Sequence, residues 1–155
     1  MVSRKILKSL TAGVLVVGLG VTLAFAAADD QIKARQAEMK ANGKAIGALV
    51  GIMKGETPYD AALVKAALDD MAAADKAAQD AHAWDATSQK GETVETWAKP
   101  EIWAEGSDIG AKYQALVDAR TALAATTDEA GFKAAFPALG KSCQGCHEEF
   151  RRPKG

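Results

Sequence analysis

Cysteine and histidine are scarce in this chain of 155 residues, which contains two of each. A structural zinc site needs four ligands. Besides one cysteine pair and the adjacent His147, the chain offers only the distant His82 and no second cysteine pair. The alternating apolar pattern of β-strands is also missing, so a thioredoxin-like Cys-x-x-Cys site would lack its βαβ context. These absences argue against both kinds of site and leave a single cysteine pair to be explained.

An excess of positive charge is missing as well, because 19 Lys and Arg stand against 20 Asp and Glu. Three of the basic residues, Arg4, Lys5 and Lys8, lie at the extreme N-terminus. Without that segment 16 basic residues remain against 20 acidic ones, a formal charge of −4. A nucleic-acid-binding surface is normally basic, so this balance argues against one, and it identifies no other partner.

The cysteine pair lies in residues 143–147, which read Cys-Gln-Gly-Cys-His. This spacing is that of a c-type haem attachment site. Two thiols three residues apart on a helix can each form a thioether with one vinyl group of the porphyrin, and the next histidine can bind the iron. We therefore predict one covalent haem c attached to Cys143 and Cys146, with His147 as the proximal iron ligand.

Residues 1–26 have the features of a secretory signal peptide. A basic start is followed by an uncharged apolar run from Leu10 to Phe25, and Ala24-Phe25-Ala26 fits the small-x-small cleavage pattern. The alternative is an uncleaved membrane anchor, but the run is shorter than the roughly 20 residues that span a bilayer. We expect cleavage, export to the periplasm and one mature domain of residues 27–155.

The first two helices are predicted from their apolar spacing and punctuation. The first should begin near Asp29 and Asp30, whose carboxylates can cap it, and the second should extend from Pro58 to about Ala81. Spacings of four and three give each an inward stripe typical of an antiparallel bundle. These stripes are Ile32, Gln36, Met39, Gly43, Ile46, Val50 and Met53 in the first helix, and Val64, Leu68, Met71, Asp75 and Ala78 in the second.

A long loop and two more helices complete the prediction. The loop extends from His82 to Trp103, and we expect its three tryptophans to pin it to the bundle. The third helix should extend from about Glu105 to Ala125. The fourth should be capped by Asp128 and contain Pro137, with an inward stripe that includes the haem cysteines: Phe132, Phe136, Leu139, Cys143, Cys146 and Phe150.

Four segments carry a family resemblance. They are Arg35-Gln36, residues 54–62 (Lys-Gly-Glu-Thr-Pro-Tyr-Asp-Ala-Ala), residues 100–103 (Pro-Glu-Ile-Trp) and residues 134–151 around the haem motif. Together they resemble the class II cytochromes c, the cytochrome c prime family, over nearly all of residues 27–155. The resemblance implies an all-α antiparallel four-helix bundle with one covalently attached haem c.

The resemblance also implies further site residues. Arg35 and Gln36 occupy the positions that lie near the haem propionates, and Arg151 lies beside the haem on the His147 side. The position four residues after the arginine is Met39, where many members have leucine or another non-ligating residue and a five-coordinate iron. A methionine there resembles the low-spin, methionine-ligated branch.

Two interpretations of Met39 stay open, because a methionine on a helical stripe can also simply fill the core. If Met39 binds the iron, the filled coordination sphere suits one-electron transfer between redox partner proteins. If it does not, a vacant site suits binding of nitric oxide or carbon monoxide. We expect no enzymatic activity, since a peroxidase needs a polar acid–base group and none is identified on the Met39 side.

Members of the family are often homodimers through their first two helices. The small residues Ala41, Ala45 and Ala48 would permit such an approach, so a homodimer is a further expectation.

Overall fold

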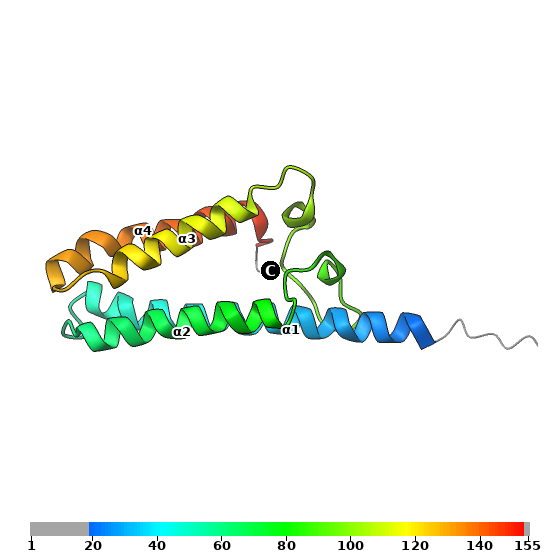
Figure 1. The fold of residues 1–155 in the computed structure, drawn as a ribbon, viewed down its shortest axis with the longest axis horizontal. Coiled ribbons are helices and arrows are strands. Elements are labelled where there is room, and N and C mark those ends of the chain that lie inside the picture. The colour runs from blue at the N-terminus through cyan, green and yellow to red at the C-terminus, as the bar shows by residue number, and fades with distance from the viewer. Residues whose placement is uncertain (1–18, 154–155) are drawn as a thin grey trace, which may run out of the picture.

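The computed structural model describes residues 19–153, with side chains from Ala27 onward, and it forms an antiparallel four-helix bundle. The helices are α1 (Leu19–Met53), α2 (Ala61–Asp80), α3 (Ile109–Ala124) and α4 (Glu129–Phe150). α1 packs mainly on α2, and α3 on α4. Figure 1 shows that the two pairs meet at the end that holds both hairpin turns and diverge toward the other end. The predicted all-α bundle is confirmed.

The hydrophobic core lies in the half of the bundle next to these hairpin turns. All four helices contribute to it, and Phe132 lies against Tyr59 and Phe136 with ring centroids 5.9 and 5.6 Å apart. Residues 143–147 lie on the second half of α4, beyond this core. The core residues are Ala45, Leu49, Ile52, Val64, Ala67, Leu68, Met71, Ala119, Leu123, Phe132 and Leu139.

α1 differs from the sequence prediction in two respects. Its backbone is helical from Leu19, so Asp29 and Asp30 lie within the helix and do not begin it. The predicted stripe is also wrong in register, since only Ile32 of its members is buried, whereas Arg35 and Glu38 are buried too. The reason is that α1 packs against two neighbours, α2 and the α2–α3 connection, and the second one accepts polar side chains.

The other helices follow the prediction more closely. Every residue of the predicted α2 stripe is buried, although α2 begins after an Asp60 N-cap and not at Pro58, and α3 begins at Ile109 rather than near Glu105. Asp128 caps α4 as expected, accepting a hydrogen bond from the Gly131 amide at 2.7 Å. α4 continues through Pro137.

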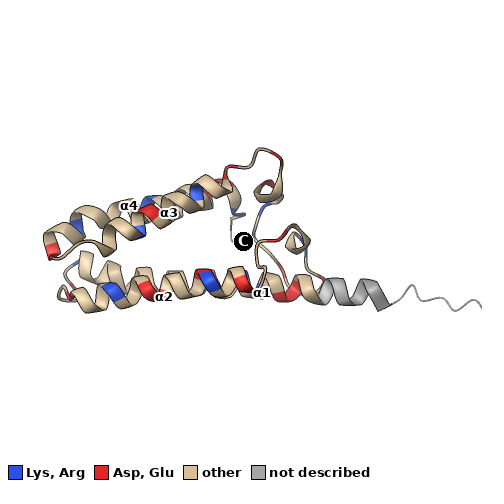
Figure 2. Ribbon diagram, viewed as in Figure 1, with Lys and Arg blue, Asp and Glu red and all other residues tan. Residues whose placement is uncertain are grey.

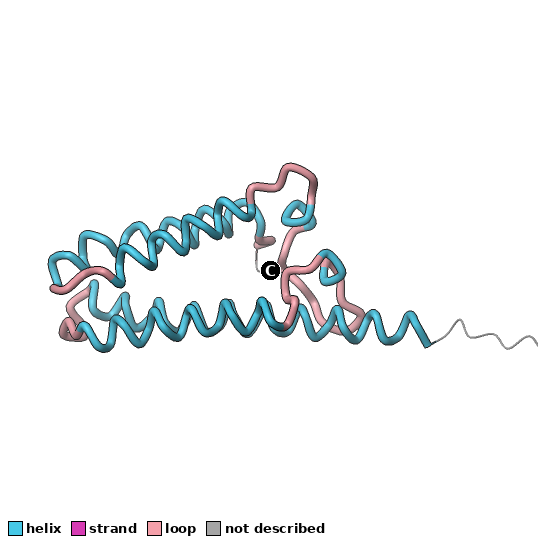
Figure 3. The backbone as a smooth tube through the Cα atoms, viewed as in Figure 1, coloured by secondary structure: helices cyan, strands magenta, loops and turns pink. Residues whose placement is uncertain are grey.

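The connection between α2 and α3 covers the diverging end of the bundle. It contains two short 3-10 helices, η1 (Ala86–Ser88) and η2 (Pro100–Trp103), and Figure 3 shows it as the long loop region of the molecule. An isolated bridge pairs Ala98 with Arg151 at the end of α4. The connection therefore touches both α1 and the end of α4.

No described helix is both long and apolar enough to cross a membrane. The predicted signal peptide, residues 1–26, lies outside the residues whose side chains are described.

Candidate functional site

Cys143 and Cys146 lie one helical turn apart on α4, both are partly buried, and neither forms a disulfide within the described residues. Burial is the main cause that raises the pKa of each thiol above its ordinary value. A reactive redox cysteine needs the opposite, a lowered pKa that favours the thiolate. The pair therefore fits attachment sites for a porphyrin better than a thiol–disulfide centre.

His147 directly follows the pair and is also partly buried. Burial, and then the positive charge of Arg151, lower the pKa of its imidazole. A neutral imidazole is the form that binds a metal ion. Arg151 thus lies near enough to His147 to act on its charge, and its place beside a haem stays a prediction.

Met39 lies on α1 outside the core. It is seven residues, or about two turns, from buried Ile32 on one side and from Ile46, which packs on the core, on the other. Yet the Met39 residue is 37% exposed, whereas Met71 in the core is 0% exposed. The core-filling interpretation therefore describes Met71 and not Met39.

Arg35 anchors the α2–α3 connection to α1. Its guanidinium is buried and donates hydrogen bonds to the Ala83 carbonyl, to Ser88 Oγ at 2.7 Å and to Thr96 Oγ1 at 3.0 Å. The rings of Trp84 and Trp103 lie 5.2 and 5.5 Å from the guanidinium carbon, within cation–π range. These contacts confirm that two of the three tryptophans pin the loop to the bundle.

Arg35 is also a buried cation that has no carboxylate within 4.0 Å in the described part of the chain. Burial lowers the pKa of its guanidinium, so an anionic partner would stabilise it. The contact with a haem propionate stays a prediction, because both Nη groups of Arg35 already donate two hydrogen bonds each to the α2–α3 connection. Gln36 is turned toward the same connection, with its Nε2 donating to the Glu95 carbonyl at 2.7 Å.

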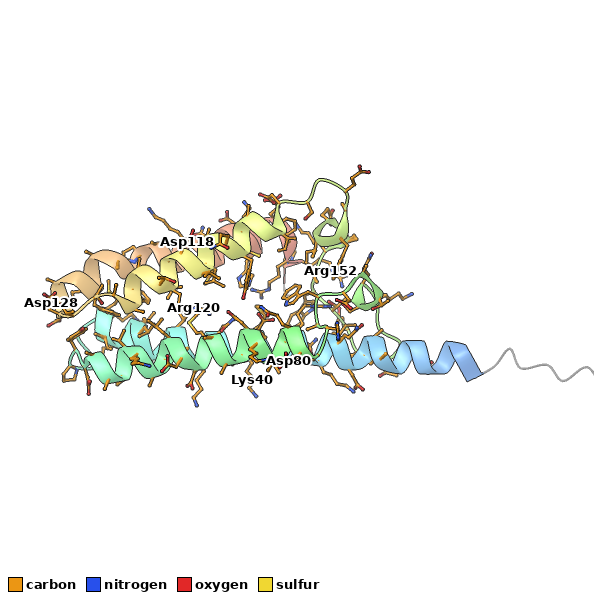
Figure 4. All side chains as sticks on the ribbon, viewed as in Figure 1. Lys40, Asp80, Asp118, Arg120, Asp128 and Arg152 are labelled. Carbon is orange, nitrogen blue, oxygen red and sulfur yellow. The ribbon has the colours of Figure 1, made fainter. Side chains whose placement is uncertain are left out.

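A polar cluster around the buried Asp75 and Glu38, with members on three helices, was not predicted as part of the site. Asp75 on α2 binds Arg120 on α3 with 2.6 Å between Oδ2 and Nη1, and the Tyr113 hydroxyl donates to the same oxygen at 3.3 Å. Figure 4 shows Arg120 between α3 and α2. Trp84 donates to Glu38 Oε2 at 2.9 Å, and burial raises the pKa of Glu38 to about 7. The one sign of this cluster in the sequence is Asp75, a charged residue on the otherwise apolar stripe of the second helix.

The comparisons with known proteins decide the family. The profile described as cytochrome c' matches residues 30–151. The chain belongs to the cytochrome c' family. It therefore carries one covalent haem c at its C-terminal Cys-x-x-Cys-His motif and belongs to a group of non-enzymatic haem proteins whose members are typically periplasmic.

Relatives named cytochrome c-556 and relatives named cytochrome c prime are both similar to this cytochrome. A cytochrome c-556 of Agrobacterium fabrum is 37% identical over 96% of this chain and 97% of its own length. Cytochrome c prime from Shewanella frigidimarina has a TM-score of 0.70 and 32% identity, covering 81% of this chain and 97% of that one. The nitric oxide complex of a mutant cytochrome c prime from Alcaligenes xylosoxidans has a TM-score of 0.67 and 29% identity, covering 82% and 97%.

Proposed function

We propose that this cytochrome carries single electrons between redox proteins, with a low-spin iron bound axially by His147 and Met39. The observation that supports the proposal most is that Met39 is not a core residue, being 37% exposed, although it lies about two turns from both Ile32 and Ile46, which pack inward. The haem supplies the one-electron couple between ferric and ferrous iron. The chain's own residues supply the rest of the site.

The two proposed axial ligands, His147 and Met39, favour fast one-electron exchange. A histidine and a thioether are the axial pair of electron-transfer cytochromes c, and the thioether raises the reduction potential. With both ligands bound, the iron has no vacant position and needs little rearrangement when its charge changes. Burial lowers the pKa of His147, which favours the neutral, metal-binding imidazole. The α2–α3 connection is held to α1 through Arg35 and Ser88.

A second function is supported by the relatives. The Alcaligenes xylosoxidans mutant was obtained as a nitric oxide complex, so a family member of this fold can hold a small gas. If Met39 does not bind the iron here, the vacant iron position suits nitric oxide or carbon monoxide.

Optical spectra of the oxidised holoprotein and of Met39→Leu distinguish the two functions. We expect the wild type to show the weak long-wavelength charge-transfer band of a sulfur-bound low-spin ferric haem. Met39→Leu should lose this band, become high-spin and bind carbon monoxide faster, because no internal ligand has to leave. The fold should persist, since such a swap usually costs less than about 1.5 kcal/mol.

Met53→Leu is the matched control, because Met53 lies on the same helix but packs against the core. Its spectrum should equal that of the wild type. A high-spin wild type whose spectrum is unchanged by Met39→Leu would favour gas binding over electron transfer.

We also infer that residues 1–26 are removed and that the mature protein is periplasmic. The basic start, the apolar run and the Ala24-Phe25-Ala26 pattern support this inference. Intact-mass measurement should place the N-terminus within about two residues of Ala27, and the mass should include one haem that acid–organic extraction does not remove. A full-length, membrane-bound holoprotein would contradict the inference.

A further inference from the structure

A hollow of about 430 Å³ lies beside His147, where the end of α4 meets residues 96–99. Three of the residues that line it are basic, and one is the predicted iron ligand. Its polar lining comprises Lys99, Gln144, His147, Glu148, Arg151 and Arg152. Figure 2 shows the basic positions at the C-terminal end of the chain and on the adjoining loop.

The backbone around this hollow is held by several hydrogen bonds. The Lys99 amide donates to the Phe150 carbonyl at 2.9 Å, and the Arg152 amide donates to the Trp97 carbonyl at 2.7 Å. Lys99 Nζ donates to the Glu149 carbonyl at 2.7 Å, and the Arg152 guanidinium donates to the Thr96 carbonyl. These acceptors are neutral, so they orient the two cations without cancelling their charge.

Neither these two cations nor Arg151 forms an ion pair with a described residue, whereas other basic residues such as Lys65, Lys76 and Lys112 do. The one acidic residue in the lining, Glu148, accepts a hydrogen bond from Gln144 at 2.6 Å. Unneutralised positive charge is therefore gathered around His147, on a chain whose residues 27–155 carry a formal charge of −4.

We propose that this hollow is the docking site for the acidic side chains of a redox partner protein, an inference that rests on the electron-transfer function proposed above. Local charge of this kind steers an oppositely charged partner to one face and fixes its orientation. A carboxylate surface seated against Lys99, Arg151 and Arg152 would lie beside His147, the residue that would hold the iron.

The wild-type holoprotein tests the proposal with a small anionic oxidant, hexacyanoferrate(III). One electron passes from the ferrous haem to this complex, which gives ferric haem and hexacyanoferrate(II). If the anion reacts at the hollow, the rate should fall as ionic strength rises, because salt screens the attraction. The net negative charge of the chain predicts the opposite trend, so a rate that rises with ionic strength would overturn the proposal.

Lys99→Gln and Arg152→Gln each remove one charge from the hollow. At low ionic strength each variant should react about two- to tenfold more slowly, within the range of electrostatic steering, with a weaker salt dependence. Lys40→Gln is the control, because it changes the net charge equally, and Figure 4 shows Lys40 pointing away from the bundle on the α1–α2 side, far from Arg152. Hexaglutamate should inhibit the wild-type reaction, whereas hexalysine should not.

Two results would contradict the docking site. The first is that both hollow variants react like Lys40→Gln. The second is that they shift the reduction potential while the salt dependence of the rate stays unchanged, which would assign these cations to the haem propionates. Failure of the electron-transfer function would be seen separately, as a high-spin spectrum of the wild type whatever the salt dependence.

Discussion

Arg35 and Glu38 are the two charged side chains of α1 that the fold buries next to the proposed iron ligand Met39. Each is satisfied by the α2–α3 connection, Arg35 through Ser88 and Thr96 and Glu38 through Trp84. Neither contact can be read from the pattern of α1 alone, because their partners lie on a loop about 50 residues further along the chain. Each residue leads to a prediction about stability.

Glu38 should make the stability of the protein depend on pH. Burial raises its pKa from 4.5 to about 7, so the folded state holds the proton more tightly than the unfolded state. The resulting stabilisation is complete below pH 4.5 and is lost as the pH rises to 7, an effect of at most about 3 kcal/mol. Glu38→Gln should remove it, as measured by urea unfolding at several pH values.

The exposed residue Glu105 provides the control, and Glu105→Gln should keep the wild-type pH dependence. Equal pH dependence in Glu38→Gln and the wild type would show that Glu38 does not titrate in this range.

Arg35→Met should loosen the α2–α3 connection. The change leaves buried acceptors at Ala83, Ser88 and Thr96 without their donor, and we expect a loss of about 3 kcal/mol in unfolding free energy. Limited proteolysis should then cut within residues 82–99 faster than in the wild type. Lys44→Met, at an exposed position of the same helix, should change the unfolding free energy by less than about 0.5 kcal/mol. An equally small effect of Arg35→Met would show that Arg35 does not anchor the α2–α3 connection.

At the scale of elements, the α2–α3 connection is also attached to α1 through Asp29. Its carboxylate is buried and accepts hydrogen bonds from the amides of Glu92 at 2.9 Å, Thr93 at 3.1 Å and Val94 at 3.3 Å. Gly91 precedes these residues, and a Cβ there would collide with the Asp29 carboxylate and lie 2.6 Å from the Val94 carbonyl oxygen. A tight approach of the backbone thus requires glycine at this position.

Gly91→Ala should therefore destabilise the protein by about 1–3 kcal/mol. Gly47→Ala is the control, because a Cβ at this helical position meets nothing within 4 Å, and it should be neutral or stabilise α1 by up to about 1 kcal/mol. Thermal unfolding of the two variants measures the difference. A Gly91→Ala protein as stable as Gly47→Ala would show that the connection can move away from Asp29.

The elements differ in how far their sequences predict them. The α2 stripe was predicted correctly because Val64, Leu68 and Met71 stand out among alanines and charged residues. The α1 stripe was predicted in the wrong register because its apolar residues are sparse and its buried face includes Arg35 and Glu38. The part of the tryptophans in anchoring the loop was predicted, but its hydrogen bonds to α1 could not be, since most of the acceptors are backbone carbonyls and a carboxylate, which have no distinctive spacing.

At the scale of the whole molecule, the core and the site occupy different halves of the bundle. The core residues gather near the hairpin turns, whereas residues 143–147 lie where the helix pairs diverge. The Asp75–Arg120 ion pair connects α2 to α3 across the two pairs. Because of this separation, we expect Met39→Leu to change the site and leave the core intact.

The homodimer stays a prediction at the same scale. Ala45 is 5% exposed and belongs to the chain's own core, but Ala41 lines a shallow hollow of about 250 Å³ between α1 and α2, together with Ala37 and Ala77. Facing hollows of this kind would let two chains pack closely. Sedimentation should give a dimer for the wild type and a monomer for Ala77→Arg, and a wild type that is monomeric at every concentration would contradict it.

The most direct test of the central claim is iron K-edge X-ray absorption of the oxidised holoprotein. If His147 and Met39 are the axial ligands, the first shell should contain five nitrogen scatterers, four from the porphyrin and one from His147, and one sulfur scatterer from Met39. Met39→Leu should lose only the sulfur. A wild-type shell with nitrogen but no sulfur would contradict the proposed ligation, and with it the assignment of this cytochrome to electron transfer.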